Sequence, residues 1–290
     1  MLSETILDDR DPELDKNLQA HVTGLNMPVA LPDVLSCDGH NLYMRSQQFD
    51  LEGNREHVAP TGISPAAPTG GMHLFSPTGF LDDSWWHRSY WVYGKGFAEG
   101  AGGWPQAGKV VPAGHLLVFD EDAVYGYARQ PEYYKWTTPV RYHLFAMARV
   151  PKVLPRPPRK PGARRPKGPN RNLPRVDLGW RWRDEVPLQV RAIALADESL
   201  FIAGPPVVVD EEEAFDHPND PAIQAKLEKQ SAALRGHGGA LLMALSATDG
   251  AKLAEYRLDS PPAWDGMAAA NGRLYLATAD GNVLCLAAAK

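Results

Sequence analysis

Short apolar segments that follow a turn residue recur along this sequence. In each copy a turn residue, often Gly, precedes a Leu-centred run with the alternation of a β-strand. The five copies are DGHNLYM (38–44), GGMHLFS (70–76), AGHLLVF (113–119), DESLFIAG (197–204) and NGRLYLAT (271–278). Their leucines, Leu42, Leu74, Leu116, Leu200 and Leu274, lie 32, 42, 84 and 74 residues apart. Spacings of this order are typical of a repeated β unit, and we expect the five leucines to be buried in equivalent strands.

The repeats extend into hairpins. AGHLLVFDEDAVYGYA (113–128) parallels NGRLYLATADGNVLCLA (271–287), because each has an acidic turn between two alternating apolar strands. The C-terminal stretch predicts four strands of one unit, at 241–246, 252–258, 266–270 and 274–278, with 283–286 pairing onward. These patterns predict an all-β fold made of antiparallel four-stranded meanders.

The stretch ALSATDGAKLAEY (244–256) resembles the PQQ repeat, a propeller-blade motif with the usual form A-L-D-A-x-T-G-K-x-x-W. Together with MLSETILDDRD (1–11), residues 25–53 and FLDDSWWHRSYWVYG (80–94), it makes most of the chain similar to the C-terminal part of bacterial PQQ-binding-like β-propeller repeat proteins. These belong to the superfamily that includes quinoprotein alcohol dehydrogenases and BamB-like assembly proteins.

The resemblance implies a β-propeller with about four or five blades in this chain, in either a closed or an incomplete ring. Residues 1–30 would form an N-terminal extension or an incoming strand, and 31–150 would form blades. Residues 151–176 would be a Pro-rich basic loop or linker, and 177–290 further blades with a helical insertion at 220–235.

Three positions depart from the repeat. Ser246 replaces its Asp, Asp249 its Thr, and Ala254 the Trp that docks one blade on the next. Quinoprotein dehydrogenases also clamp the cofactor with two adjacent cysteines, whereas the two cysteines here, Cys37 and Cys285, are far apart. The resemblance therefore favours the architecture but no quinone or other cofactor, and we expect no metal site or catalytic residue.

Two interruptions have a distinct composition. Residues 152–175 hold nine Lys or Arg, seven Pro and no acid, which predicts a solvated loop without specific nucleic-acid binding. In 220–235, Asp220 is a candidate N-cap before Pro221, and Gly236 ends the helical pattern. The acidic stretch 210–217 lacks the ligand spacing of a calcium loop, so we expect a solvated loop there.

The segment FSPTGFLDDSWWHRSYWVYG (75–94) concentrates aromatic residues on both faces of a strand-like stretch. Packing between sheets would explain this pattern, and a binding patch for a sugar or peptide would explain it as well. The candidate binding residues are Asp82, Asp83, Trp85, Trp86, His87 and Arg88.

We therefore expect a non-catalytic propeller that binds or scaffolds a protein or glycan partner. The alternative is a degenerate quinoprotein dehydrogenase whose cofactor site lies in a missing N-terminal region. No run of apolar residues is long enough for a membrane span. The N-terminus lacks a signal peptide, although the resemblance suggests an exported protein, and unpaired propeller edges would favour self-association.

Overall fold

The computed structural model consists mainly of antiparallel β-sheets, as the sequence predicts. The chain divides into an N-terminal unit, Met1–His115 with Val150–Gly179, and a C-terminal unit, Leu116–Arg149 with Trp180–Lys290. The structure describes residues 4, 13–14, 21–22, 27–28, 33–44, 47–55, 73–76, 91–94, 108, 111–130, 141–155 and 175–287.

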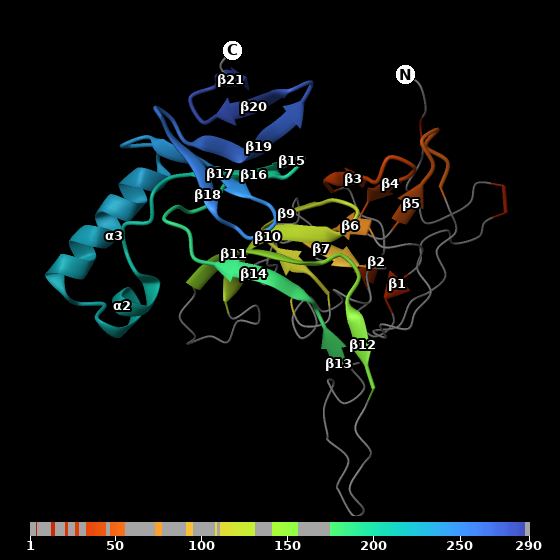
Figure 1. Cartoon of the computed structure of the whole chain (residues 1–290), viewed down its shortest axis with the longest axis horizontal. Coiled ribbons are helices and arrows are strands. Elements are labelled where there is room, and N and C mark those ends of the chain that lie inside the picture. The colour runs from red at the N-terminus through yellow and green to blue at the C-terminus, as the bar shows by residue number, and fades with distance from the viewer. Residues whose placement is uncertain are drawn as a thin grey trace, which may run out of the picture. The chain divides into compact units, whose positions relative to one another are not determined.

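Three sheets make up most of the C-terminal unit (Figure 1). Sheet A has the order β9-β10-β11-β14, sheet B β15-β16-β17-β18, and sheet C β19-β20-β21, so each follows the chain as an antiparallel meander. The strands are β9 (Leu116–Phe119), β10 (Ala123–Gln130), β11 (Arg141–Ala148), β14 (Trp180–Asp184), β15 (Ala192–Ala196), β16 (Ser199–Gly204), β17 (Ala240–Ser246), β18 (Lys252–Leu258), β19 (Pro262–Ala270), β20 (Arg273–Thr278) and β21 (Val283–Ala287).

The described residues of the N-terminal unit form four smaller antiparallel sheets. In this unit β3 and β4 lie against β6, and the Ser36 hydroxyl donates a hydrogen bond to the Leu74 carbonyl oxygen. The sheets are β1 (His21–Val22) with β2 (Met27–Pro28), β3 (Leu35–Cys37) with β4 (Leu42–Met44) and β5 (Gln47–Phe49), β6 (His73–Phe75) with β7 (Trp91–Gly94) and β8 (Ala113–Gly114), and β12 (Lys152–Leu154) with β13 (Arg175–Asp177).

An aspartate turn opens the second strand of a meander in both units. The Asp120 carboxylate accepts hydrogen bonds from the backbone N–H groups of Asp122 and Ala123 at 2.8 and 2.7 Å. The Tyr125 hydroxyl then donates to the same carboxylate at 3.1 Å, and Tyr43 donates to Asp38 in the same way at 2.8 Å. DGHNLY and DEDAVY are therefore equivalent segments, because side-chain hydrogen bonds of Asp favour such turns.

This equivalence shows that the repeat alignment was wrong by one strand. Leu42, Leu200 and Leu274 lie in second strands, whereas Leu74 and Leu116 lie in first strands. Leu116, Leu200 and Leu274 are buried, but Leu42 and Leu74 are only partly buried. Every hairpin of a meander has the same local pattern of apolar strand, polar turn and apolar strand, so the pattern does not identify which hairpin it belongs to.

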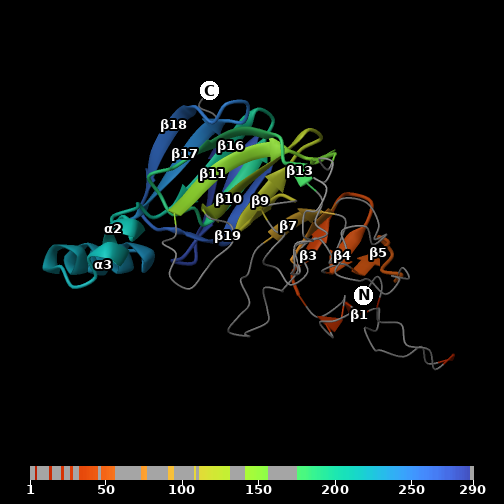
Figure 2. The ribbon, with the colours of Figure 1, turned by 90° about the horizontal axis from the view of Figure 1, so that it is seen from below.

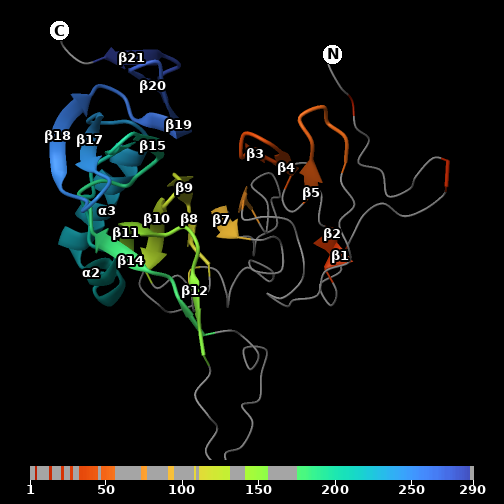
Figure 3. The ribbon, with the colours of Figure 1, turned by 45° about the vertical axis from the view of Figure 1, so that its right-hand side comes forward.

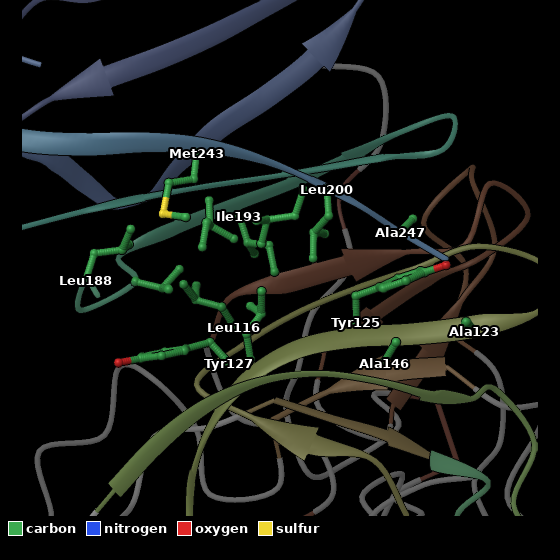
Figure 4. Packing of buried hydrophobic residues seen from close by; sticks show 14 residues of the cluster. Leu116, Ala123, Tyr125, Tyr127, Ala146, Leu188, Ile193, Leu200, Met243 and Ala247 are labelled. Carbon is green, nitrogen blue, oxygen red and sulfur yellow. The ribbon is translucent and has the colours of Figure 1, made fainter. Parts of the chain in front are cut away.

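The main core fills the space between sheets A and B (Figure 4). Met243, Ile193 and Leu200 approach from sheet B, and Leu116 and Tyr127 approach from sheet A. A second core, with Leu242, Leu258, Leu274 and Leu276 among its members, joins sheets B and C. Alternate residues of a strand face opposite sides, so sheet B contributes one face to each core.

Trp182 fastens sheet A to sheet B at one end of the main core. Its indole N–H donates to the Ala247 carbonyl oxygen at 2.9 Å. A Cβ atom added to Gly250 would lie 3.0 Å from the Trp182 ring, and Gly250 has a positive φ of 76°. The Trp that docks neighbouring sheets is thus present on β14, although the equivalent position on β18 is Ala254.

The last five predicted strands are present, but they belong to two sheets and not to one. The segments at 241–246 and 252–258 are β17 and β18 of sheet B, and the remaining three are β19, β20 and β21 of sheet C. Pro261 lies between β18 and β19, and Pro262 is the first residue of β19. Proline has no backbone N–H to donate, so a sheet ladder does not continue readily through this pair.

Two helices form an insertion between β16 and β17 (Figure 2). The prediction for 220–235 is confirmed by α3 (Pro221–Leu234), in which the Asp220 carboxylate caps the N-terminus. The loop prediction for 210–217 was wrong, because this stretch contains α2 (Glu211–Asp216), capped by Asp210. The Asp210 cap satisfies backbone N–H groups at the start of the helix, and the acidic side chains of the first turn interact favourably with the helix dipole. Both effects favour a helix over a solvated loop.

The basic tract begins and ends in strands. β12 and β13 pair antiparallel, with Val153 opposite Val176, while 156–174 lie outside the described residues. Among the described residues, no helix has both the length and the apolar character that crossing a membrane requires.

The Trp182 contact predicts a measurable loss of stability. We expect Trp182→Ala to lower the free energy of unfolding by about 3 kcal/mol, because it removes a half-buried ring and a hydrogen bond. Trp182→Phe keeps most of the packing, so it should lose only about half as much. Urea unfolding followed by far-UV circular dichroism measures both, and a loss below about 1 kcal/mol in the alanine variant would contradict the docking role.

Candidate functional site

The predicted binding residues are not placed by the structure. Asp82, Asp83, Trp85, Trp86, His87 and Arg88 all lie outside the described residues. The same aromatic segment continues into β7, where Trp91 is 6% exposed and Tyr93 is fully buried. These two aromatic side chains therefore serve in packing.

A polar cluster lies at the end of the main core opposite Trp182. We call Tyr127, Tyr142, Arg129 and Glu211 the tyrosine–glutamate cluster. The rings of Tyr127 and Tyr142 stack, with centroids 5.2 Å apart and an angle of 14° between their planes. Figure 4 shows Tyr127 and Tyr125 at opposite ends of the core. The cluster thus marks the end of sheets A and B from which the helical insertion departs.

The strand register brings this cluster together. Arg129 on β10 lies directly opposite Tyr142 on β11, so both side chains share the face of sheet A that carries Tyr127. Glu211 lies in the first turn of α2. Asp210 caps this helix, because its carboxylate accepts hydrogen bonds from the backbone N–H groups of Glu212 and Glu213 at 2.8 and 3.0 Å. The strand register thus positions the two tyrosines and Arg129, and the capped helix positions Glu211, so residues far apart in the sequence come together.

Ion pairs hold α2 beside the cluster. Arg141, the first residue of β11, pairs with Glu212, and its other terminal nitrogen lies 3.9 Å from Glu185. Lys226 of α3 pairs with Glu213 of α2 at 2.8 Å. All these side chains are substantially exposed, so each pair contributes on the order of 0–1 kcal/mol and mainly orients the helix.

Burial controls the protonation of the cluster. It raises the pKa of Tyr127 and of Tyr142, and the negative charge of Glu211 raises both further. Partial burial also raises the pKa of Glu211, whereas the nearby charge of Arg129 lowers it. Both hydroxyls are therefore protonated at neutral pH.

The outer members of the cluster carry groups that exchange hydrogen bonds with a bound molecule. Tyr127 is 4% exposed and packs in the main core, whereas Tyr142 and Arg129 are partly buried and Glu211 is exposed. The Tyr142 hydroxyl and the Arg129 guanidinium donate hydrogen bonds, and the Glu211 carboxylate accepts them. A partner with hydroxyl, amide or charged groups would find complementary atoms here.

His143 lies on the opposite face of sheet A from the cluster. Its side chain is 2% exposed, and neither imidazole nitrogen has a hydrogen-bond partner among the described residues. The rings of Phe145 and Trp180 lie 5.6 and 6.0 Å away between centroids. Burial, with a smaller contribution from the charge of Arg183, lowers the pKa of His143 to about 4, so the ring is neutral at pH 7.

A repeated triplet in the sequence contains this buried histidine. The triplet His-Leu-Phe occurs at 73–75 and at 143–145, and in both places the histidine is buried beside the phenylalanine two residues later. The ring centroids are 5.1 Å apart in the first copy and 5.6 Å in the second. The repetition indicates a packing role, since residues i and i+2 share one face of a strand.

Asp265 occupies an irregular point of β19. Its φ is 54°, which is rare outside glycine, and its backbone N–H donates to the Arg191 carbonyl oxygen at 2.8 Å. Nearby protein raises the pKa of Asp265 to about 6 through desolvation, although part of the side chain is open to solvent. The adjacent Trp264 is 48% exposed.

The buried histidine predicts a pH-dependent stability. The pKa of His143 is lower in the folded chain than in the unfolded chain. The free energy of unfolding therefore decreases as the pH drops from about 6.5 to about 4. The difference in pKa corresponds to roughly 3 kcal/mol over that range. We expect His143→Leu to remove this part of the pH dependence and to leave the stability at pH 7 equal or higher.

The measurement compares urea unfolding of the variant and the native sequence at several pH values. His237→Leu is the control, because His237 is exposed. The raised pKa of Asp265 makes its contribution to stability change with pH in the opposite direction over an overlapping range. The test therefore uses the difference in free energy of unfolding between His143→Leu and the native sequence at each pH. Parallel pH profiles for His143→Leu and the native sequence would contradict the assignment.

Comparison with known proteins does not identify this chain: no protein-family model matches it, and no curated protein does so.

Proposed function

We propose that this protein is a non-catalytic propeller-type module that binds or scaffolds a protein or glycan partner. The observation that carries the proposal is the tyrosine–glutamate cluster, a set of aromatic rings, hydrogen-bond donors and charges held at one end of two packed sheets. Binding sites are commonly built where loops leave a rigid scaffold.

The arrangement of sheets supports a propeller. β15, the first strand of sheet B, lies beside β9 and β19, the first strands of sheets A and C (Figure 3). In the N-terminal unit β3 and β6, again first strands, also lie beside each other. Blades placed radially around one axis bring their innermost strands together in this way, and each blade is a sequential meander.

The docking of Trp182 on Gly250 gives further support. A contact from the fourth strand of one sheet to a turn of the next is the relation that the PQQ-repeat resemblance implies between neighbouring blades. We therefore retain a PQQ-repeat propeller as the proposed architecture. The role as a binding module rests on the character of the cluster and not on the architecture, since one fold serves many functions.

We propose two separate binding regions, one in each unit of the chain. The first is the tyrosine–glutamate cluster, and the second is the aromatic segment with Asp82, Asp83, Trp85, Trp86, His87 and Arg88. Trp, Tyr and Arg are the residues that most often dominate binding energy at interfaces, and both regions contain them. A glycan would stack on the rings and exchange hydrogen bonds with the carboxylates, and a peptide would use the same groups.

The test is direct binding to a glycan array and to a peptide array, with single-residue variants of the full chain. We expect Trp85→Ala, Trp86→Ala, Arg88→Ala or Tyr142→Ala to weaken binding to a ligand found on either array by about tenfold or more. Tyr256→Ala is the control, because Tyr256 is 59% exposed on β18 and belongs to neither proposed region.

Two results would contradict the proposal. Uniform loss of stability without a specific change in binding would assign these residues to packing. The second result is micromolar binding of pyrroloquinoline quinone in the presence of Ca²⁺, measured by calorimetry, together with dye-linked dehydrogenase activity. This result would establish the quinoprotein alternative instead.

A further inference from the structure

The outer edge of sheet C differs from the outer edges of sheets A and B. Sheets A and B end in a fourth strand, whereas sheet C ends in its third strand, β21. On its inner side β21 pairs with β20, with Cys285 opposite Tyr275. Within the part of the chain that the structure describes, no strand pairs with its other side.

Composition separates β21 from β14 and β18, the outer edge strands of sheets A and B. β14 reads WRWRD and β18 reads KLAEYRL, so both carry charges of the kind that keep exposed edges from pairing. β21 reads VLCLA and has no charged residue. It resembles β17, ALLMALS, which pairs on both sides. β21 therefore has the composition of a strand with two neighbours.

The hydrogen-bond phase identifies the groups that point outward. The Thr278 N–H donates to the Asn282 carbonyl oxygen at 2.9 Å, which makes this pair a hydrogen-bonded one. Hydrogen-bonded and non-hydrogen-bonded pairs alternate along an antiparallel ladder. The N–H and C=O groups of Val283, Cys285 and Ala287 therefore point away from β20, toward the open edge.

The side chains at this edge are exposed and apolar. Val283 is 69% exposed and Leu286 is 37% exposed, and Cys285 is a free, exposed thiol. The nearest charge on the same face is Arg273 on β20, whose Nη1 lies 3.7 Å from the Cys285 sulfur. Arg273 stands one strand in from the edge and its guanidinium reaches Cys285, whereas β21 itself contributes no charged side chain.

We propose that β21 pairs antiparallel with β21 of a second copy of this chain. The two-fold axis would pass beside Cys285, which places Cys285 opposite Cys285, Leu284 opposite Leu286, and Val283 opposite Ala287. The sequence L-C-L is symmetric about that centre, so the edge is complementary to itself, as an interface with two-fold symmetry requires. Pairing joins the two copies of sheet C into one six-stranded sheet.

A second copy suits this edge better than an unrelated partner. A symmetric apolar strand without charges gives no means of selecting a different sequence, whereas self-pairing satisfies every outward N–H and C=O group in one register. The contact involves only five residues on each side. An interface of this size is at the small end of specific interfaces, so we expect a dissociation constant in the range of about 1–100 μM.

Sedimentation equilibrium of the full chain from about 2 to about 200 μM tests the dimer. We expect the mean mass to rise toward twice that of one chain, and Cys285→Lys to weaken the association at least tenfold, because two charges would meet at the axis. Ala268→Lys is the matched control. Ala268 is exposed on the same face of sheet C, but it lies on β19, two strands from the edge. The melting temperature of each variant confirms that it is folded.

Thiol cross-linking tests the register. In Cys37→Ser, Cys285 is the only cysteine, and we expect a short bis-maleimide linker to join two chains at dimer-forming concentrations. Cys37→Ser with Val283→Lys should give much less cross-linked product. A monomer at every concentration, or a dimer that Cys285→Lys leaves intact, would overturn the proposal. So would cross-linking that is equally efficient in the Val283→Lys variant.

Discussion

Face-to-face packing of sheets A and B is the interaction on which the C-terminal unit depends. Each sheet buries alternate residues of its strands in the shared core, including Leu116, Leu144, Leu200 and Ile202. Gly126 permits close packing on the other face of sheet A, because a Cβ atom there would lie 2.3 Å from the Leu117 side chain and 2.6 Å from Phe145. Polar groups lie at the two ends of this core. Trp182 and the aspartate turn occupy one end, and the tyrosine–glutamate cluster occupies the other.

Two buried polar side chains in the C-terminal unit differ in whether their hydrogen-bonding groups are satisfied. Gln230 of α3 is 5% exposed, and its amide accepts from the Val208 N–H at 2.7 Å and donates to the Pro206 carbonyl at 3.2 Å. These bonds tie the helical insertion to the chain that precedes it. His143 has no such bonds and is kept neutral by burial. The first group orders a segment, whereas the second reduces stability and makes it sensitive to acid.

The outer edge strands of sheets A, B and C differ in charge. β14 and β18, which end their sheets, carry Arg, Lys, Asp or Glu, and the interior strand β17 carries none. Lys252 and Glu255 even pair at 3.0 Å along the exposed strand β18. β21 departs from this relation, since its position is that of an edge and its composition is that of an interior strand. The same physical rule therefore explains two edges and singles out the third.

The sequence alone determined the all-β class, most of the C-terminal strands and the bounds of α3, because alternation of apolar residues and helix capping are local properties. Only the tertiary structure decided which hairpins are equivalent, since Leu42 and Leu116 follow the same local pattern in different strands. It also decided that β18 and β19 belong to separate sheets. Tyr127, Tyr142 and Glu211 escaped the sequence analysis because strand register and a helix cap more than 60 residues away bring them together. Long-range pairing of this kind leaves no periodic signal in the chain, whereas the burial of alternate residues does.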